Sequence, residues 1–160
     1  MKAVLALADG KIYEGKHFGS EKEVEAEIVF NTSMSGYQEI ITDPSYCGQM
    51  VVMTYPLIGN YGINPEDFES DQPYLSGFII KELSRIHSNW RSRGSLEEFL
   101  KKHNVFGIQG IDTRALTRRI RDKGAQQAIL SINTKEPQKL IEKARNSPDL
   151  IGRDLVKEVT

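Results

Sequence analysis

Hydrophobic and polar residues alternate in short runs through the first third of the chain. "AVLALADGKIYEG" contains an apolar run, the turn dipeptide Asp9-Gly10 and an alternating run, which is the pattern of a β-hairpin. "VEAEIVFNTS" alternates more cleanly, with apolar residues at positions 24, 26, 28 and 30 and glutamate at 23, 25 and 27. This second pattern predicts a half-buried strand.

Short apolar runs continue through the middle of the chain. "QMVVMTYP" and "SGFIIKEL" (76–83) each predict a short strand, and "VFGIQG" and "QQAILSI" predict two more. Between the first two lies "IGNYGINPEDFESDQP", which is rich in Gly, Asn, Asp and Pro. That composition favours a surface loop over a tight turn.

Helical patterns lie between these strands. "GYQEIITDP" predicts a short helix that ends before Pro44, because the residue preceding a proline disfavours helical backbone. "LEEFLKKHN" predicts a second helix. "TRALTRRIRDK" predicts a third helix, with Asp112 positioned as its N-terminal cap and Gly124 positioned as a left-handed C-terminal cap. Thr134 is placed to cap "KEPQKLIEKARNS", where Pro137 is tolerated in the first turn.

The order of elements is strands first and then alternating strands and helices. We see no internal repeat, low-complexity tract or linker, so residues 1–160 are interpreted as one domain. The expected fold class is α/β, with an antiparallel sheet from the first third, a partly parallel sheet from the rest and helices covering them.

Composition and charge exclude several classes of protein. The 160 residues are 39% hydrophobic, and 21 Lys and Arg against 22 Asp and Glu leave a formal net charge of −1. This balance gives no overall attraction to nucleic acid or to a membrane. The apolar runs fall far short of the ~20 residues of a membrane helix, and the start has no signal-peptide pattern. A single cysteine fits a reducing compartment, so we expect a cytoplasmic location.

Cys47 is the chain's only cysteine, and its surroundings do not favour a nucleophile. A catalytic cysteine needs a lowered pKa from a nearby base or a helix N-terminus. Cys47 instead follows a turn and precedes a strand, and the three histidines, at 17, 87 and 103, show no spacing that marks one as a base. We interpret Cys47 as a buried small hydrophobic residue, and we predict no catalytic residue in this chain.

Metal and nucleotide motifs are not found in the sequence. No second cysteine or close pair of histidines provides zinc-type spacing, and "PEDFESD" lacks the pattern of a calcium loop. The sequence contains neither of the two glycine-rich motifs that bind nucleotide phosphates, G-x-x-x-x-G-K-[ST] and G-x-G-x-x-G. We therefore expect no metal site and no cofactor in this chain.

The helix at 113–123 is strongly basic. Arg114, Arg118 and Arg121 share one face, and Arg119 and Lys123 flank them. Three interpretations stay open: a solvated face, a surface that binds carboxylates of a partner protein, or a nucleic-acid site. The last is disfavoured, because no aromatic residues are interleaved with the arginines.

The stretch Asp43-Pro44-Ser45-Tyr46 has the composition of a β-turn. Asp43 can bond the backbone two residues on, and Pro44 presets its own φ. Such a rigid, exposed turn would present the Ser45 hydroxyl outward. Ser45 then either completes the turn or forms a hydrogen bond with a ligand.

Long stretches of the chain resemble one known family. "VFNTSMSGYQEIITDPSYCGQMVVMTYPLIGNYG" and "GIDTRALTRRIRDKGA" are similar to the small, glutamine amidotransferase subunit of carbamoyl-phosphate synthetase. "LALADGKIYEGKHFG" near the start and "GRDLVKEVT" at the end are also similar, so the resemblance extends over essentially the whole chain.

The resemblance implies a fold and a place in a larger enzyme. It implies an N-terminal domain with a layered β/β/α, swivelling-type fold, followed in the family by a class I amidotransferase domain that carries a Cys-His-Glu triad. We expect that this chain ends before the triad and is inactive alone.

The resemblance also implies partners and a reaction. Ammonia from glutamine would pass through a tunnel to a large subunit of the heterodimer, a ligase that uses bicarbonate, ATP and Mg²⁺ to make carbamoyl phosphate for arginine and pyrimidine biosynthesis. The serine of the "TDPSY" turn, here Ser45, would bind glutamine beside the amidotransferase domain. The alternative is a pure scaffold with no substrate contact.

Overall fold

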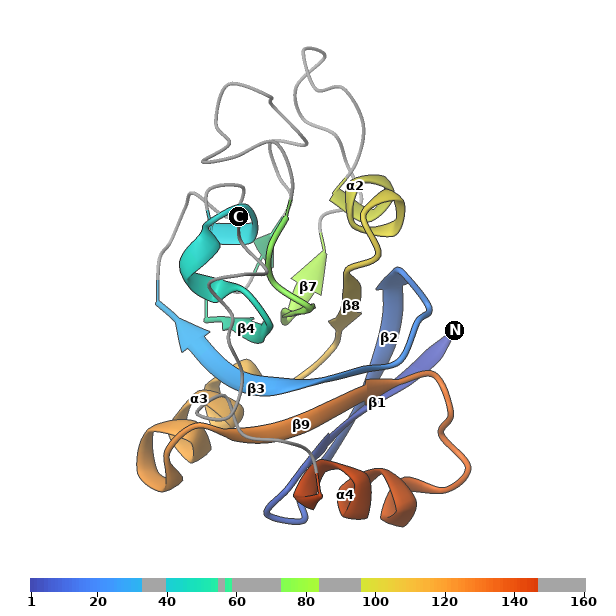
Figure 1. The fold of residues 1–160 in the computed structure, drawn as a ribbon, viewed down its shortest axis with the longest axis vertical. Coiled ribbons are helices and arrows are strands. Elements are labelled where there is room, and N and C mark those ends of the chain that lie inside the picture. The colour runs from blue at the N-terminus through green and yellow to red at the C-terminus, as the bar shows by residue number, and fades with distance from the viewer. Residues whose placement is uncertain (33–39, 55–56, 59–72, 84–95, 147–160) are drawn as a thin grey trace.

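A seven-stranded barrel is the centre of the structure. The computed structural model describes residues 1–32, 40–54, 57–58, 73–83 and 96–146. Around the closed barrel the strands follow the order β1-β2-β8-β6-β4-β3-β9 (Figure 1). Their bounds are β1 Lys2–Leu7, β2 Ile12–Gly19, β3 Val24–Asn31, β4 Gln49–Met53, β6 Gly77–Ile79, β8 Phe106–Gln109 and β9 Gln126–Ser131.

Smaller elements surround the barrel. Strands β5 (Leu57–Ile58) and β7 (Glu82–Leu83) form a separate parallel pair. The remaining described elements are η1 Pro44–Tyr46, α2 Leu96–Lys102, α3 Thr113–Lys123 and α4 Pro137–Arg145. None of the helices in the described residues is long and apolar enough to cross a membrane.

The predicted hairpin and the predicted alternating strand are confirmed. β1 and β2 pair antiparallel, and Gly10 has a φ of 102° in the turn between them. Glycine suits this position because a side chain at positive φ would be strained. β3 runs antiparallel to β9, with Ala26 and Ile28 buried.

The other half of the barrel is parallel. β3 pairs parallel with β4, β4 with β6, and β6 with β8. Residues 50–53 of β4 are all buried, because the strand is covered on both faces. This explains why "QMVVMTYP" has no polar alternation. The predicted strand at 76–83 is instead two strands, β6 and β7, separated by Ile80 and Lys81.

The predicted fold class is confirmed at the level of a mixed α/β fold. The sequence pattern suggested an antiparallel sheet and a separate, partly parallel sheet, but the structure joins both sets of strands in one barrel. The join is possible because β3 is antiparallel to one neighbour and parallel to the other. The layered swivelling arrangement stays a prediction.

The barrel interior is filled by side chains. Alternate residues of the strands form one buried cluster, to which α3 adds Leu116 and Ile120. A second cluster packs Leu100 of α2 against outward residues of β4 and β6. In a third, Leu140 and Ile141 of α4 pack against β1 and β9. Helices therefore cover the outside of the barrel and also pack onto its interior cluster.

The helix-boundary predictions have mixed outcomes. Asp112 caps α3 as expected, since its Oδ1 accepts a hydrogen bond from Ala115 N at 3.1 Å. Gly124 has a positive φ of 83°, but its ψ of 168° lies outside the left-handed helical region. The Thr134 cap is wrong: α4 begins at Pro137, a residue favoured at the first helical position because it lacks an N–H.

Other predictions fall partly outside the described residues. Helical backbone at Ile40 and Ile41 gives way to a turn before Pro44, as expected, but residues 36–39 of that helix are not described. Nearly all of the predicted loop at 58–73 and the whole segment that contains His87 are also outside the described ranges.

Asp9 connects the first hairpin to α3 and β9. Its Oδ2 accepts hydrogen bonds from Arg119 Nε at 2.7 Å and from Gln126 Nε2 at 2.8 Å. Burial alone would raise the pKa of Asp9, but hydrogen bonds from Arg119, Gln126 and the Lys11 N–H outweigh it and hold the pKa below its ordinary value. The charged carboxylate therefore stabilises the fold.

We predict that Asp9→Asn lowers the free energy of unfolding at neutral pH by roughly 1–2 kcal/mol. This value lies between the typical contribution of an exposed ion pair and that of a hydrogen bond to a charged group. The pKa of Asp9 is lower in the folded state than in the unfolded state. The extra stability of wild type over Asp9→Asn is therefore present above the ordinary carboxyl pKa of about 3.9, and it is lost as the pH falls through the lowered pKa. Urea denaturation across the pH range measures this difference.

Asp122→Asn is the matched control, since Asp122 is exposed on the same helix as Arg119. It should change stability by less than about 0.5 kcal/mol. If the difference in free energy of unfolding between Asp9→Asn and wild type did not change with pH, the charged role of Asp9 would be contradicted.

Candidate functional site

Ser45 lies at the tip of an exposed corner. The single turn η1 begins after Asp43, whose Oδ1 accepts a hydrogen bond from Ser45 N at 2.9 Å. Backbone hydrogen bonds from Tyr46 N to Asp43 O and from Cys47 N to Pro44 O, both 3.1 Å long, close the turn. The predicted turn is thus confirmed, and Ser45 is exposed.

Buried residues anchor both sides of this corner. Thr42, before the turn, is fully buried, and Cys47, after it, is 8% exposed. The Tyr46 hydroxyl accepts a hydrogen bond from Asn31 Nδ2 at 2.9 Å, which ties the turn to the end of β3. The corner is therefore held rigidly, and the Ser45 side chain projects from it.

Cys47 is buried, as predicted for a small hydrophobic residue. The two described histidines have other partners: His17 Nε2 lies 2.7 Å from Ser20 O, and the His103 ring packs on Phe99. Burial, and then the charge of Lys102, lower the pKa of His103. Neither of these two histidine contacts involves Cys47. In the described part of the chain, no group of three or more potential metal ligands is found.

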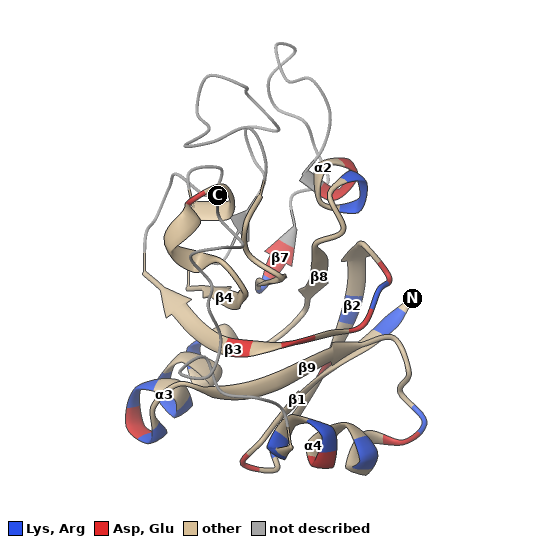
Figure 2. Cartoon of the chain, in the orientation of Figure 1, with Lys and Arg blue, Asp and Glu red and all other residues tan. Residues whose placement is uncertain are grey.

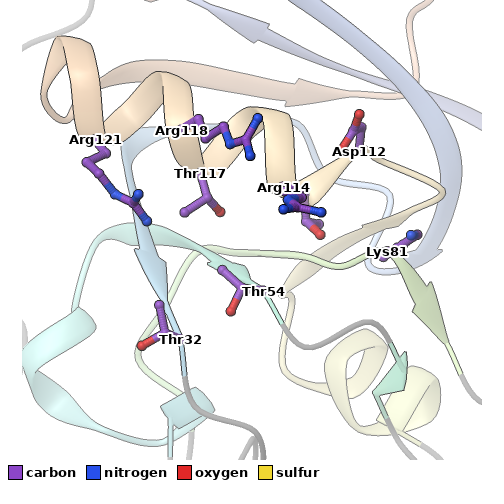
Figure 3. A pocket seen from close by; sticks show the side chains of 9 residues that line it. Thr32, Thr54, Lys81, Asp112, Arg114, Thr117, Arg118 and Arg121 are labelled. Carbon is purple, nitrogen blue, oxygen red and sulfur yellow. The ribbon is translucent and has the colours of Figure 1, made fainter.

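A second candidate site lies beneath α3. A pocket of about 460 Å³ opens between this helix and the ends of the parallel strands (Figure 3). Thr32 follows β3, Thr54 follows β4, and Lys81 lies two residues after β6. The other described residues that line the pocket belong to α3 and its N-cap: Asp112, Thr113, Arg114, Thr117, Arg118 and Arg121.

The basic face predicted for α3 is confirmed in part. Arg114, Arg118 and Arg121 all line the pocket, and Figure 2 shows basic residues along this helix. Arg119, which the sequence grouped with them as a flanking residue, instead forms the ion pair with Asp9. One helix thus carries both a structural arginine and a face that borders a cavity.

Sequence reasoning missed several residues of this pocket. It did not single out Thr32, Thr54, Lys81 or Thr117, since none of them belongs to a recognised motif and they lie in separate segments of the chain. One signal was available in the sequence: Thr32 and Thr54 lie near the carboxyl ends of two predicted strands. The structure pairs these strands in parallel. Polar residues at the carboxyl ends of parallel strands commonly face ligands.

One protein-family model matches the chain over residues 5–130, and it describes the carbamoyl-phosphate synthase small chain, CPSase domain. The chain belongs to this family. The resemblance inferred from the motifs around Ser45 and Asp112 is thereby confirmed.

Curated relatives in this family are similar over nearly the whole chain. The carbamoyl phosphate synthase small chain of Syntrophotalea carbinolica is 64% identical over 160 residues, which are 100% of this chain and 43% of that protein. The small chain of Aquifex aeolicus is 55% identical over 158 residues, 99% of this chain and 43% of that protein. The chain therefore spans about two fifths of the length of these relatives.

Among solved structures, an aminopeptidase from Aneurinibacillus sp. is similar with a TM-score of 0.45 and 14% identity, covering 81% of this chain and 30% of the aminopeptidase. A likeness this low carries no argument about fold or function.

We predict that Asp43→Ala destabilises the corner that presents Ser45, because the variant removes the oxygen that accepts from Ser45 N. The loss should be about 0.5–2 kcal/mol, as for other capping side chains, measured by urea denaturation. Asp43→Asn keeps an acceptor oxygen at the same place and should stay within about 0.5 kcal/mol of wild type. Equal destabilisation by both variants would contradict the capping role.

Proposed function

We propose that this chain acts as the N-terminal domain of the glutamine-hydrolysing small subunit of carbamoyl-phosphate synthase, a ligase. The observation that carries the proposal is the family match over residues 5–130. The 64% identical relative supports it, because it matches 100% of this chain and is a carbamoyl phosphate synthase small chain.

In this proposal the domain contributes an edge of the glutamine site and a docking surface for the large subunit. The amidotransferase domain of the same subunit would supply the Cys-His-Glu triad and release ammonia. The large subunit would then use that ammonia with bicarbonate, ATP and Mg²⁺ to make carbamoyl phosphate for arginine and pyrimidine biosynthesis. The assembly would be cytoplasmic.

Ser45 is the residue of this domain proposed to contact glutamine. Its backbone N–H is already used by Asp43, so its hydroxyl is the group available to a ligand. The hydroxyl makes no hydrogen bond with another described residue, and the side chain is exposed. A hydroxyl can donate to the carboxylate or amide oxygen of glutamine and can accept from its N–H groups. The rigid corner would hold that hydroxyl in place before glutamine arrives.

We predict that Ser45→Ala in the intact two-subunit enzyme raises the KM for glutamine. One lost neutral hydrogen bond of about 0.5–1.5 kcal/mol corresponds to a change of roughly two- to tenfold. Carbamoyl phosphate synthesis from free ammonia should stay near the wild-type rate, because it bypasses the glutamine site. Steady-state kinetics with the two nitrogen donors measure both quantities.

Ser45→Thr keeps a hydroxyl and should retain most of the affinity for glutamine. An unchanged KM for glutamine in Ser45→Ala would favour the pure scaffold. Equal loss with glutamine and ammonia would instead indicate a defect in folding or assembly.

We also predict that the 160-residue chain alone releases no ammonia from glutamine, since the proposed triad belongs to another domain. Coupled assays of ammonia release, run beside the intact enzyme, test this. Activity that disappears in Cys47→Ala would contradict both this prediction and the interpretation of Cys47 as a buried hydrophobic residue.

A further inference from the structure

The pocket beneath α3 lies where ligands commonly bind in α/β proteins. β3, β4, β6 and β8 are successive parallel neighbours, so their carboxyl ends meet at one edge of the barrel. Thr32 and Thr54 come directly after the first two of these strands. Crevices outside the carboxyl ends of parallel strands are frequent ligand sites. The volume of about 460 Å³ falls within the usual range for small-molecule pockets.

The lining of this pocket is strongly positive. Among the described residues that line it, Lys81, Arg114, Arg118 and Arg121 contribute four cations, and Asp112 contributes the single carboxylate. Asp112 already accepts a hydrogen bond from the α3 backbone as its cap. None of the four cations forms an ion pair with a described residue. Their mutual repulsion would be relieved by an anion bound between them.

Thr117 provides an independent sign of a missing partner. It is 4% exposed, and its Oγ1 has no hydrogen-bond partner among the described residues. Figure 3 shows its side chain pointing from α3 into the pocket, toward Thr54. Buried hydroxyls are nearly always hydrogen-bonded, because leaving one unpaired costs free energy. A ligand atom in the pocket would satisfy it.

We infer that this pocket binds a small oxyanion, a molecule with a carboxylate or phosphate group. The arginine forks match the paired oxygens of either group, and the Thr117 hydroxyl can donate to a third position. Ser45 does not line this pocket, so the inference is independent of the proposed glutamine contact. The same chemistry could also come from an acidic side chain of a neighbouring polypeptide.

Titration of the intact small chain with inorganic phosphate and with succinate tests this inference, first alone and then in its complex with the large chain. Methyl NMR of Thr117 and isothermal calorimetry give the binding curve. We expect saturable binding by wild type. Arg118→Gln should weaken it about ten- to a hundredfold, the effect of losing a charge-assisted hydrogen bond.

Thr117→Val separates ligand binding from folding. It removes an unpartnered buried hydroxyl while keeping the shape of the side chain, so the unfolding midpoint without anion should be unchanged or higher. Its affinity for the anion should nevertheless fall about two- to tenfold. Lys123→Gln is the charge-matched control, because Lys123 is exposed on the same helix and does not line the pocket.

Binding in both the free chain and the complex, weakened as predicted, would support a free small anion as the ligand. Anion binding by the free small chain but not by its complex, together with weaker assembly of the Arg118→Gln variant with the large chain, would also support the oxyanion site. In that case an acidic side chain of the assembly occupies the site. No saturable binding, or equal binding by wild type, Arg118→Gln and Thr117→Val, would overturn the inference.

Discussion

The pairing of β9 with both β1 and β3 is the constraint on which the barrel depends. β9 lies late in the chain, and it runs antiparallel to two strands from the first 31 residues. Without it, β1 and β3 would be exposed sheet edges with unpaired backbone groups. Its central residues are buried on both faces: Ala128 and Leu130 lie inside the barrel, and Ile129 packs under α4. This strand therefore couples the closure of the barrel to the docking of a helix.

Barrel closure also sets the geometry of both candidate sites. Asn31, the last residue of β3, holds Tyr46 and so steadies the corner that carries Ser45. The next residue, Thr32, lines the pocket beneath α3. The end of β3 thus connects a rigid exposed turn to a positively charged cavity. A disturbance of this strand would be expected to reach both sites together.

Helix α3 shows how one short segment can serve several purposes. Leu116 and Ile120 pack into the interior cluster, and Arg119 reaches back to Asp9 at the hairpin turn. The face with Arg114 and Arg118 borders the pocket. Apolar contacts and the ion pair with Asp9 fix the position of this helix. Its three pocket-lining arginines are therefore held around one cavity even though they repel one another. That arrangement is what makes the cavity suited to an anion.

The sequence by itself determined the local elements and the family. Period-two alternation predicted β3, the Asp9-Gly10 dipeptide predicted the hairpin, and Asp43 with Pro44 predicted the corner at Ser45, because each depends on residues close in the chain. The long collinear motifs likewise predicted the family, which the family model over residues 5–130 confirms. The start of α4 was missed, because Thr134 was taken as its cap although the helix begins at Pro137 and has no side-chain cap hydrogen bond.

Only the tertiary structure decided how these elements combine. Closure into one barrel depends on strand pairs whose partners lie about a hundred residues or more apart, which no local pattern encodes. The same is true of the pocket, where Thr32, Lys81 and Thr117 meet from three distant segments. Whether an arginine pairs with Asp9 or borders a cavity depends on which face of α3 turns toward the barrel. That choice follows from the burial of Leu116 and Ile120.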